Sequence, residues 1–174
     1  YTTRVGGGPF PSEAEPKMAA WLQQKGNEFG ATTGRPRRCG WLDTVAVSYA
    51  CQINGINKLA LMKPDVLEEL DEIPICVGYQ YKGSLLKEFP PEIWVLEAVK
   101  PVYKTFKGWK TALRSISSWE ELPSQFLDYI RYIEDALEAE VVIISTGKGR
   151  SETLIKEKEI ASLVNLEEIK SCLT

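Results

Sequence analysis

Short apolar runs alternate with helical patterns along this chain, and that alternation limits most strongly the folds open to it. Residues 58–62, 102–106 and 141–144 have the pattern of strands, and the first and last of these read as buried. Helical patterns cover 14–25, 41–53 and a stretch of about 15 residues that carries Phe126, Ile130, Ile133 and Leu137 on one face. Strands alternating with helices favour an α/β domain in layers, with a largely parallel sheet flanked by helices.

Local sequence signals refine the prediction for two of these helices and predict one further strand. The helix at 41–53 is expected to bury one face and to end at Asn54-Gly55. That face consists of Leu42, Val45, Ala46, Tyr49 and Ile53. Ser118-Trp-Glu-Glu121 has the spacing of a capping box ahead of the last long helix. Residues 74–83 predict a strand that enters a hairpin completed near 84–89.

Composition excludes several classes of protein. The 174 residues fit one domain with a sizeable core, and a net charge of −3 argues against a nucleic-acid partner. No apolar run approaches the roughly 20 residues of a membrane-spanning helix, so we expect no membrane partner either. No signal peptide is recognisable, and the first residue is Tyr rather than Met, which leaves room for an upstream segment.

Cysteine and histidine usage points to the cytoplasm and restricts the chemistry. The four cysteines, Cys39, Cys51, Cys76 and Cys172, are widely spaced and predict reduced, buried thiols rather than disulfides or zinc ligands. The chain has no histidine, so it lacks the commonest general acid–base and the commonest transition-metal ligand.

The segment Gly30-Ala-Thr-Thr-Gly-Arg-Pro-Arg-Arg38 concentrates donors for an anion. Thr32 and Thr33 supply hydroxyls, and three guanidiniums follow within a few residues. Guanidinium groups match carboxylates and phosphates, and irregular backbone leaves amides free to help. A small, multiply charged anion is therefore the expected ligand. A solvated basic loop or a nucleic-acid contact is the alternative.

Two further segments follow apolar strands. Lys63-Pro-Asp65 could read guanine, because one carboxylate can accept both the ring N1–H and the 2-amino group; the alternative is that Asp65 caps a helix. Ser145-Thr-Gly147 could offer backbone N–H groups to guanine O6, or it could be a simple strand-to-loop turn. Ligands collect at the carboxyl ends of parallel strands, where both segments stand.

The glycine-rich run Gly6-Gly-Gly-Pro-Phe-Pro11 is too flexible for a helix and lacks the GK[ST] ending of a phosphate loop. It is expected to be a turn, and its glycines could also let backbone approach a ligand closely.

With these segments taken together, the chain resembles the adenylosuccinate synthetase family. The matching segments, in order, are 5–13, 26–43, 62–67, Leu122-Pro123 and 145–147. The string from Gly26 to Asp43 is highly specific. Met62 and Pro64 depart from the family pattern, and the stretch 83–117 matches poorly. The resemblance covers about 1–155, leaving 156–174 as a short helical or disordered tail.

The resemblance implies a GTP-dependent ligase that joins L-aspartate to IMP in purine nucleotide biosynthesis. GTP phosphorylates the inosine 6-oxygen, and the aspartate amine then displaces phosphate. By position, aspartate would contact Gly30, Ala31, Thr32, Thr33, Arg35 and Arg37. The Val5 carbonyl and Arg35 would lie near IMP. GTP would be held by Arg37, Lys63, Asp65, Ser145, Thr146 and Gly147.

The resemblance also implies what this chain does not supply. The family's phosphate loop, its catalytic aspartate and histidine and the Mg²⁺ ligands belong to an N-terminal part. We therefore expect a C-terminal region with a layered architecture like that of P-loop NTPases, incomplete and inactive alone, with no catalytic residue and no metal ligand of its own. The complete enzyme would be a cytoplasmic homodimer. The alternatives are a non-catalytic guanine-nucleotide-binding module and a purely structural protein.

Overall fold

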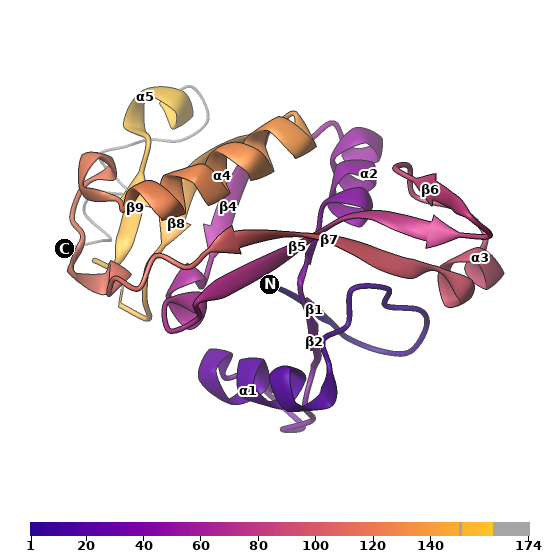
Figure 1. The fold of residues 1–174 in the computed structure, drawn as a ribbon. Coiled ribbons are helices and arrows are strands. Elements are labelled where there is room, and N and C mark those ends of the chain that lie inside the picture. Colours follow the sequence, from indigo (N-terminus) through magenta and orange to yellow (C-terminus); the bar gives the residue numbers. More distant parts are fainter. Residues whose placement is uncertain (150, 162–174) are drawn as a thin grey trace. The chain divides into compact units, whose positions relative to one another are not determined.

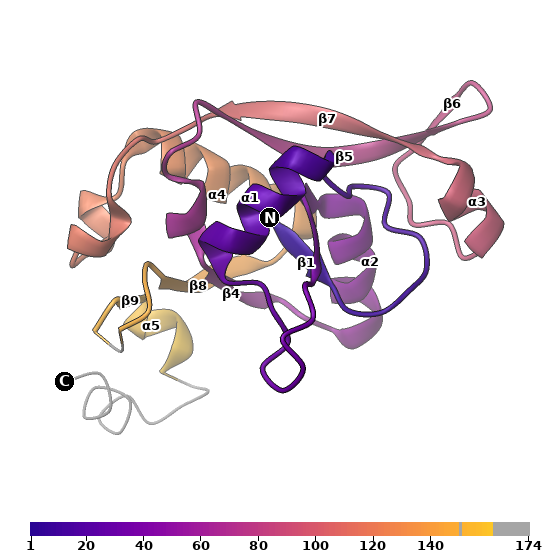
Figure 2. The same cartoon turned by 90° about the horizontal axis from the view of Figure 1, so that it is seen from below.

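The computed structural model describes residues 1–149 and 151–161 and has the mixed α/β composition expected from the sequence (Figures 1 and 2). The chain divides into two compact units. The first comprises Tyr1–Ile53 and Ile73–Phe106, and the second comprises 54–72 and the described residues from 107 onward.

The first unit holds most of the strands. They are β1 (Thr2–Arg4), β2 (Arg38–Gly40), β3 (Leu42–Asp43), β5 (Glu72–Tyr81), β6 (Ser84–Leu86) and β7 (Lys100–Lys107). Its helices are α1 (Pro16–Gly26), α2 (Thr44–Asn54) and α3 (Ile93–Ala98). β1 pairs antiparallel with β2, whereas β3 pairs parallel with β5. β5 also pairs with β7 and, antiparallel, with β6, which completes the predicted hairpin (Figure 2).

The core of the first unit forms where α2 meets this sheet. Buried Val45, Cys76, Tyr79 and Val99 pack together, and Phe89 lies partly buried against them. Asp43 begins α2 as its cap: its Oδ1 accepts hydrogen bonds from the N–H groups of Val45 and Ala46, each at 3.1 Å. Its Oδ2 accepts one from the Tyr79 hydroxyl at 2.7 Å, so one buried carboxylate joins the helix to the sheet.

The second unit packs helices on a three-stranded sheet. Its strands are β4 (Lys58–Met62), β8 (Glu140–Ser145) and β9 (Thr153–Ile155), and its helices are α4 (Ser124–Leu137) and α5 (Glu157–Ile160). β4 and β8 are parallel, and β9 returns antiparallel to β8. The predicted face of α4 is confirmed, because all four of its apolar residues are buried; Tyr129 joins them.

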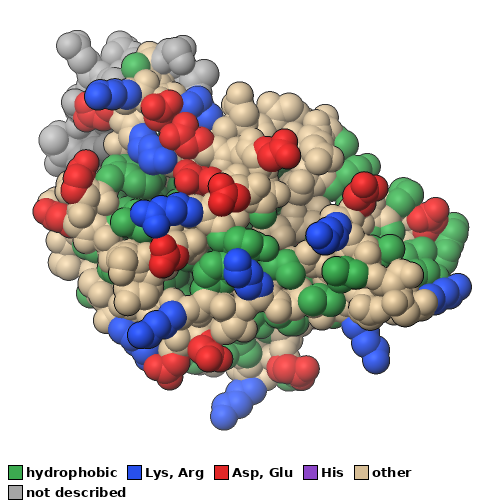
Figure 3. Space-filling view, turned by 45° about the horizontal axis from the view of Figure 1, so that its top comes forward, with side chains coloured by type: hydrophobic (Ala, Val, Ile, Leu, Met, Phe, Trp, Pro, Cys, Tyr) green, Lys and Arg blue, Asp and Glu red, His purple; other side chains and the backbone are tan. Residues whose placement is uncertain are grey.

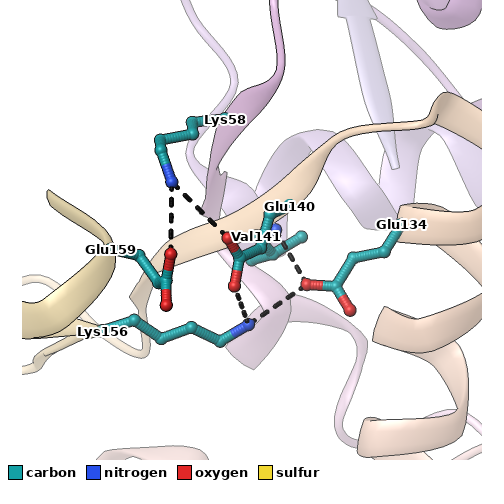
Figure 4. A network of polar contacts seen from close by, with 6 residues as sticks. All are labelled: Lys58, Glu134, Glu140, Val141, Lys156 and Glu159. Atoms are coloured by element: carbon teal, nitrogen blue, oxygen red, sulfur yellow. Dashed lines mark hydrogen bonds and ion pairs between the residues drawn. The ribbon is translucent and has the colours of Figure 1, made fainter.

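A network of polar contacts ties the elements of the second unit together (Figure 4). Lys156 Nζ lies 3.2 Å from both Glu134 Oε1 and Glu140 Oε1. Lys58 Nζ lies 3.5 Å from Glu140 Oε2 and from Glu159 Oε2. Glu140 is therefore shared by two ammonium groups, one from β4 and one from the residue between β9 and α5.

Two local expectations were wrong. Tyr49 and Ile53 lie exposed on α2 rather than on its buried face; Tyr49 stacks on Phe89 with ring centroids 5.1 Å apart. The capping box at Ser118 does not form, because Ser118 makes no side-chain cap and precedes only a 3-10 turn, η3 (Trp119–Glu121). The Glu121 carboxylate instead accepts a hydrogen bond from the N–H of Ser117 at 3.0 Å.

Within the described residues, Cys39, Cys51 and Cys76 form no disulfide and are buried, as predicted. Cys172 and most of the expected tail fall in 162–174, outside the described residues. Among the described helices, none has the length and apolar character needed to cross a membrane. On the face drawn in Figure 3, basic side chains lie interspersed with acidic ones, in keeping with the small net charge.

Candidate functional site

The parallel pair β4–β8 brings together the two segments predicted to hold guanine. Met62, the last residue of β4, is the register partner of Ser145, the last residue of β8. Lys63-Pro-Asp65 and Ser145-Thr-Gly147 therefore leave the same edge of the sheet from neighbouring strands. This is the carboxyl edge, where ligands of parallel sheets collect.

Asp65 is half-enclosed in a tight turn. Lys63 takes a left-handed conformation with φ of 57°, and Pro64 then starts the 3-10 helix η1 (Pro64–Leu67). Lys63 occupies the cap position, so the alternative that Asp65 caps a helix is wrong. The Asp65 side chain is 14% exposed, and its Oδ2 lies 3.5 Å from Nη2 of Arg114 in the 3-10 helix η2 (Leu113–Ser115).

The loop after β8 is built around Glu152. The Glu152 carbonyl accepts hydrogen bonds from the N–H of Thr146 at 2.8 Å and from its hydroxyl at 3.2 Å. The Glu152 carboxylate accepts one from the N–H of Gly149 and lies so close to Gly147 that a Cβ there would collide with it. The expected strand-to-loop turn is thus present. Within the described residues the Gly147 N–H donates no hydrogen bond, so it is available to a carbonyl oxygen.

The predicted anion segment forms a closed, exposed loop in the first unit. Phe29 and Pro36 form an antiparallel bridge at its base. Above them, the N–H of Gly30 donates to the carbonyl of Arg35, and the N–H of Gly34 donates back to the carbonyl of Gly30, each at 2.9 Å. Gly34 has φ of +64°, which a glycine adopts without strain. Residues 31–36, which include both threonines, are all exposed.

The three arginines of this segment differ in their partners. Arg35 is exposed, and among the described residues its guanidinium has no hydrogen bond or ion pair. Arg37 Nη1 donates to Glu28 Oε2 at 2.9 Å. Arg38 forms a two-pronged ion pair with Glu13 and donates to the Gly8 carbonyl at 2.7 Å. The segment is therefore not a uniform solvated basic loop.

The glycine-rich run beside Val5 borders a cavity. Val5 is 82% exposed, and Gly6 and Gly8 have positive φ, which confirms the turn. A cavity of about 660 Å³ opens beside this run. Its walls include Gly7, Gly8, Phe10, Asp43, Tyr79, Phe89 and Leu96.

Two ionisable groups in the cavity wall have shifted pKa values. Burial raises the pKa of Asp43, although hydrogen bonds from Tyr79 and from two backbone N–H groups oppose the shift. Burial and the charge of Asp43 raise the pKa of the Tyr79 hydroxyl. The hydroxyl therefore remains a hydrogen-bond donor at neutral pH.

The residues predicted for aspartate and for IMP thus lie in the first unit, and Lys63, Asp65 and Ser145–Gly147 lie in the second. Sequence reasoning missed Glu28, Arg114 and Glu152. Glu28 lies in the segment from Gly26 to Asp43 that resembles the family, but only its burial in the structure shows that its carboxylate needs partners. No group of three or more Cys, Asp or Glu side chains in the described part of the chain could hold a metal ion.

Comparison with known proteins identifies the family. A family model described as adenylosuccinate synthetase matches residues 1–154. The chain is 47% identical over 160 residues to the adenylosuccinate synthetase of Thermodesulfovibrio yellowstonii, covering 92% of this chain and 38% of that protein. It is 48% identical over 152 residues to the enzyme of Aquifex aeolicus, covering 87% and 35%.

A solved structure agrees. The chain matches the structure of fully ligated adenylosuccinate synthetase from Plasmodium falciparum with a TM-score of 0.84 and 41% identity, covering 90% of this chain and 38% of that one. The chain therefore spans 35–38% of the length of these relatives, and it belongs to the adenylosuccinate synthetase family.

Proposed function

We propose that this chain supplies the aspartate and guanine half-sites of an adenylosuccinate synthetase. The complete enzyme would use GTP to phosphorylate the 6-oxygen of IMP and would then let the amine of L-aspartate displace phosphate. The products would be adenylosuccinate, GDP and phosphate. The family match supports this ligase chemistry.

The observation that carries the proposal is the shared sheet edge of Met62 and Ser145. There Asp65 would accept the guanine N1–H and 2-amino protons, the Lys63 stem would lie along the base, and the Ser145–Gly147 loop would offer N–H to O6. A site that pairs with both edge groups of guanine rejects bases that lack them.

In the first unit, the exposed loop would receive the L-aspartate carboxylates. Gly30 to Thr33 would contribute amides and hydroxyls, and Arg35 and Arg37 would contribute charge. The exposed guanidinium of Arg35, which pairs with no described residue, supports this role, because a charge-assisted pair with a carboxylate needs a donor not already engaged. Arg35 and the Val5 carbonyl would also approach the IMP ribose, and Arg37 would also approach GTP.

The remaining chemistry would come from elsewhere in the enzyme. With no histidine in the chain and no cluster of metal ligands among its described residues, we assign the acid–base step, the phosphate loop and the Mg²⁺ ligands to other segments. Mg²⁺, when bound, would neutralise charge on the transferred phosphoryl group. We propose a cytoplasmic homodimer as the complete enzyme and expect the isolated chain to be inactive.

A reconstitution experiment tests the proposal. A complete synthetase that contains this chain should form adenylosuccinate from IMP, GTP and aspartate. Arg35→Leu and Arg37→Leu should raise the aspartate KM, and Asp65→Asn should weaken the binding of GTP. If this chain is instead a guanine-binding module, GTP binding should respond to Asp65→Asn while nothing depends on the two arginines.

A further inference from the structure

Glu28 is a buried carboxylate to which the proposed chemistry gives no task. Its residue is only 3% exposed. An ionised carboxylate in a protein interior is costly unless it is paired and hydrogen-bonded. Glu28 has both kinds of partner: Oε1 accepts a hydrogen bond from the Tyr1 hydroxyl at 2.7 Å, and Oε2 accepts one from Arg37 Nη1 at 2.9 Å.

The backbone around Glu28 is equally fixed. Its N–H donates to the Gln23 carbonyl near the end of α1 at 2.8 Å, and its carbonyl accepts from the N–H of Arg37 at 2.9 Å. The Gln23 side chain then donates to the Arg37 carbonyl at 2.6 Å. Arg37 is thus held to Glu28 by main chain and side chain together. The pair lies at the base of the exposed loop, directly outside the Phe29–Pro36 bridge.

The ion pair engages only part of the Arg37 guanidinium. An arginine carries five N–H donors, and the only hydrogen bond from this side chain to a described residue uses Nη1. The side chain is 36% exposed. Arg37 can therefore remain bonded to Glu28 while its other donors are open to a ligand. Its orientation is restricted before any ligand arrives, unlike that of Arg35.

We propose that Glu28 is a positioning residue for the exposed loop that would bind L-aspartate, and that it acts through Arg37. Its buried carboxylate presets the guanidinium, so that the ordering cost of a long side chain is met on folding rather than on binding. This inference rests on the proposed function, because it assumes that Arg37 contributes to aspartate binding.

A double-mutant cycle in a complete synthetase that contains this chain tests the inference. The variants are Glu28→Gln, Arg37→Leu and the two combined, with kcat and the KM values for aspartate and IMP measured for each. We expect Glu28→Gln and Arg37→Leu each to raise the aspartate KM about tenfold. The double variant should match Arg37→Leu alone, because Glu28 is proposed to act through Arg37. The kcat and the IMP KM should stay within about twofold.

Several outcomes overturn the inference. If the two effects multiply, Glu28 acts independently of Arg37. If Glu28→Gln lowers the aspartate KM or leaves it unchanged, the ion pair opposes binding or is irrelevant to it. If kcat falls and the KM values for both aspartate and IMP rise while the melting temperature drops, the role is merely structural. Should Glu28→Gln not fold, Glu28→Asp, which keeps the charge but shortens the reach to Arg37, takes its place: a raised aspartate KM supports the inference, and an unchanged one refutes it.

Two controls separate this inference from the proposed function. Asp128→Asn breaks an acid–arginine pair that is exposed on both sides, Asp128–Arg131 on α4, and should leave the aspartate KM unchanged. Arg35→Leu tests the aspartate site itself. If neither Arg35→Leu nor Arg37→Leu affects aspartate, the proposed site fails; if both do and Glu28→Gln does not, only the inference fails.

Discussion

Met62 of β4 and Ser145 of β8 are register partners in a parallel pair of strands, so the two chain segments that follow them start side by side. Segments about eighty residues apart in sequence thereby share one sheet edge. The residues proposed to read guanine are positioned by sheet hydrogen bonding rather than by loop flexibility alone.

Asp65→Asn should exchange nucleotide preference at this edge. A carboxylate accepts from the guanine 2-amino group but repels the 2-oxygen of xanthine, whereas an amide can donate to that oxygen. In competition binding, we expect the ratio of xanthosine to guanosine triphosphate affinity to rise by about 10². Asp71→Asn makes the same change at an exposed side chain and should have no effect. Equal loss of both nucleotides would argue against Asp65 as the reader.

Arg35→Leu and Arg37→Leu should separate binding from stability. Arg35 has no intramolecular ion pair among the described residues, so its loss should raise the aspartate KM and leave the melting temperature unchanged. Arg37→Leu should also destabilise the fold by about 1–3 kcal/mol, because it removes the guanidinium that donates a charge-assisted hydrogen bond to the buried Glu28 carboxylate. Kinetics and thermal unfolding measure the two effects. Arg131→Leu on α4 is the control, and an unchanged aspartate KM in both loop variants would contradict the assignment.

The sequence predicted elements well where one periodic pattern controls burial, and less well where a distant contact does. The face of α4 was predicted because Phe126, Ile130 and Ile133 repeat at helical spacing and all meet the core. On α2 the same reasoning failed at Tyr49, because Phe89 from outside the helix offers a stacking partner at the surface.

The site shows the same division. The loop glycines and arginines could be recognised from their spacing, but their partners could not. Nothing in the local sequence distinguishes Arg37, which pairs with buried Glu28, from Arg35, which pairs with no acidic residue in the described part of the chain. The approach of Arg114 to Asp65 depends on two 3-10 turns meeting in the second unit, which no short pattern encodes.

The pH dependence of stability should report the Asp43–Tyr79 pair. Burial raises the pKa of Asp43 above its ordinary value of 3.8. At pH values between 3.8 and the raised pKa, Asp43 keeps a proton in the folded chain that it has released in the unfolded chain. The free energy of unfolding therefore falls as pH rises through this window. Asp43→Asn removes the titrating group and should flatten that fall in urea unfolding measured from pH 3 to 7. A slope unchanged in the variant would contradict the prediction.

Tyr79→Phe should destabilise the first unit by about 1–3 kcal/mol, because it leaves one oxygen of the buried Asp43 without its hydroxyl donor. It should also widen the pH window, since that hydrogen bond opposes the rise in the Asp43 pKa. Tyr49→Phe, which keeps the exposed ring stack on Phe89, should change stability by less than about 0.5 kcal/mol. Equal effects of the two substitutions in urea unfolding would refute this account.

Acid should weaken the ion network of the second unit. Burial alone would raise the pKa of Glu140, but the hydrogen bond and charge of Lys156 and the charge of Lys58 lower it below 4.5 overall. The contribution of Glu140 is therefore present above that value and lost as pH falls through its lowered pKa. Glu140→Gln should abolish this acid-sensitive part, about 1 kcal/mol or less, and reduce the salt dependence of unfolding. Asp135→Asn, at an exposed position on α4, should change neither.

The three described thiols all belong to the first unit. Burial raises the pKa of Cys76 to about 12 and also raises that of Cys51, so alkylating reagents meet little thiolate until the surrounding packing opens. Trp109 and Trp119 belong to the other unit. In a Cys172→Ser background that also replaces Trp21, Trp41 and Trp94 of the first unit with Phe, thiol labelling would time the opening of the first unit while the fluorescence of Trp109 and Trp119 follows the second.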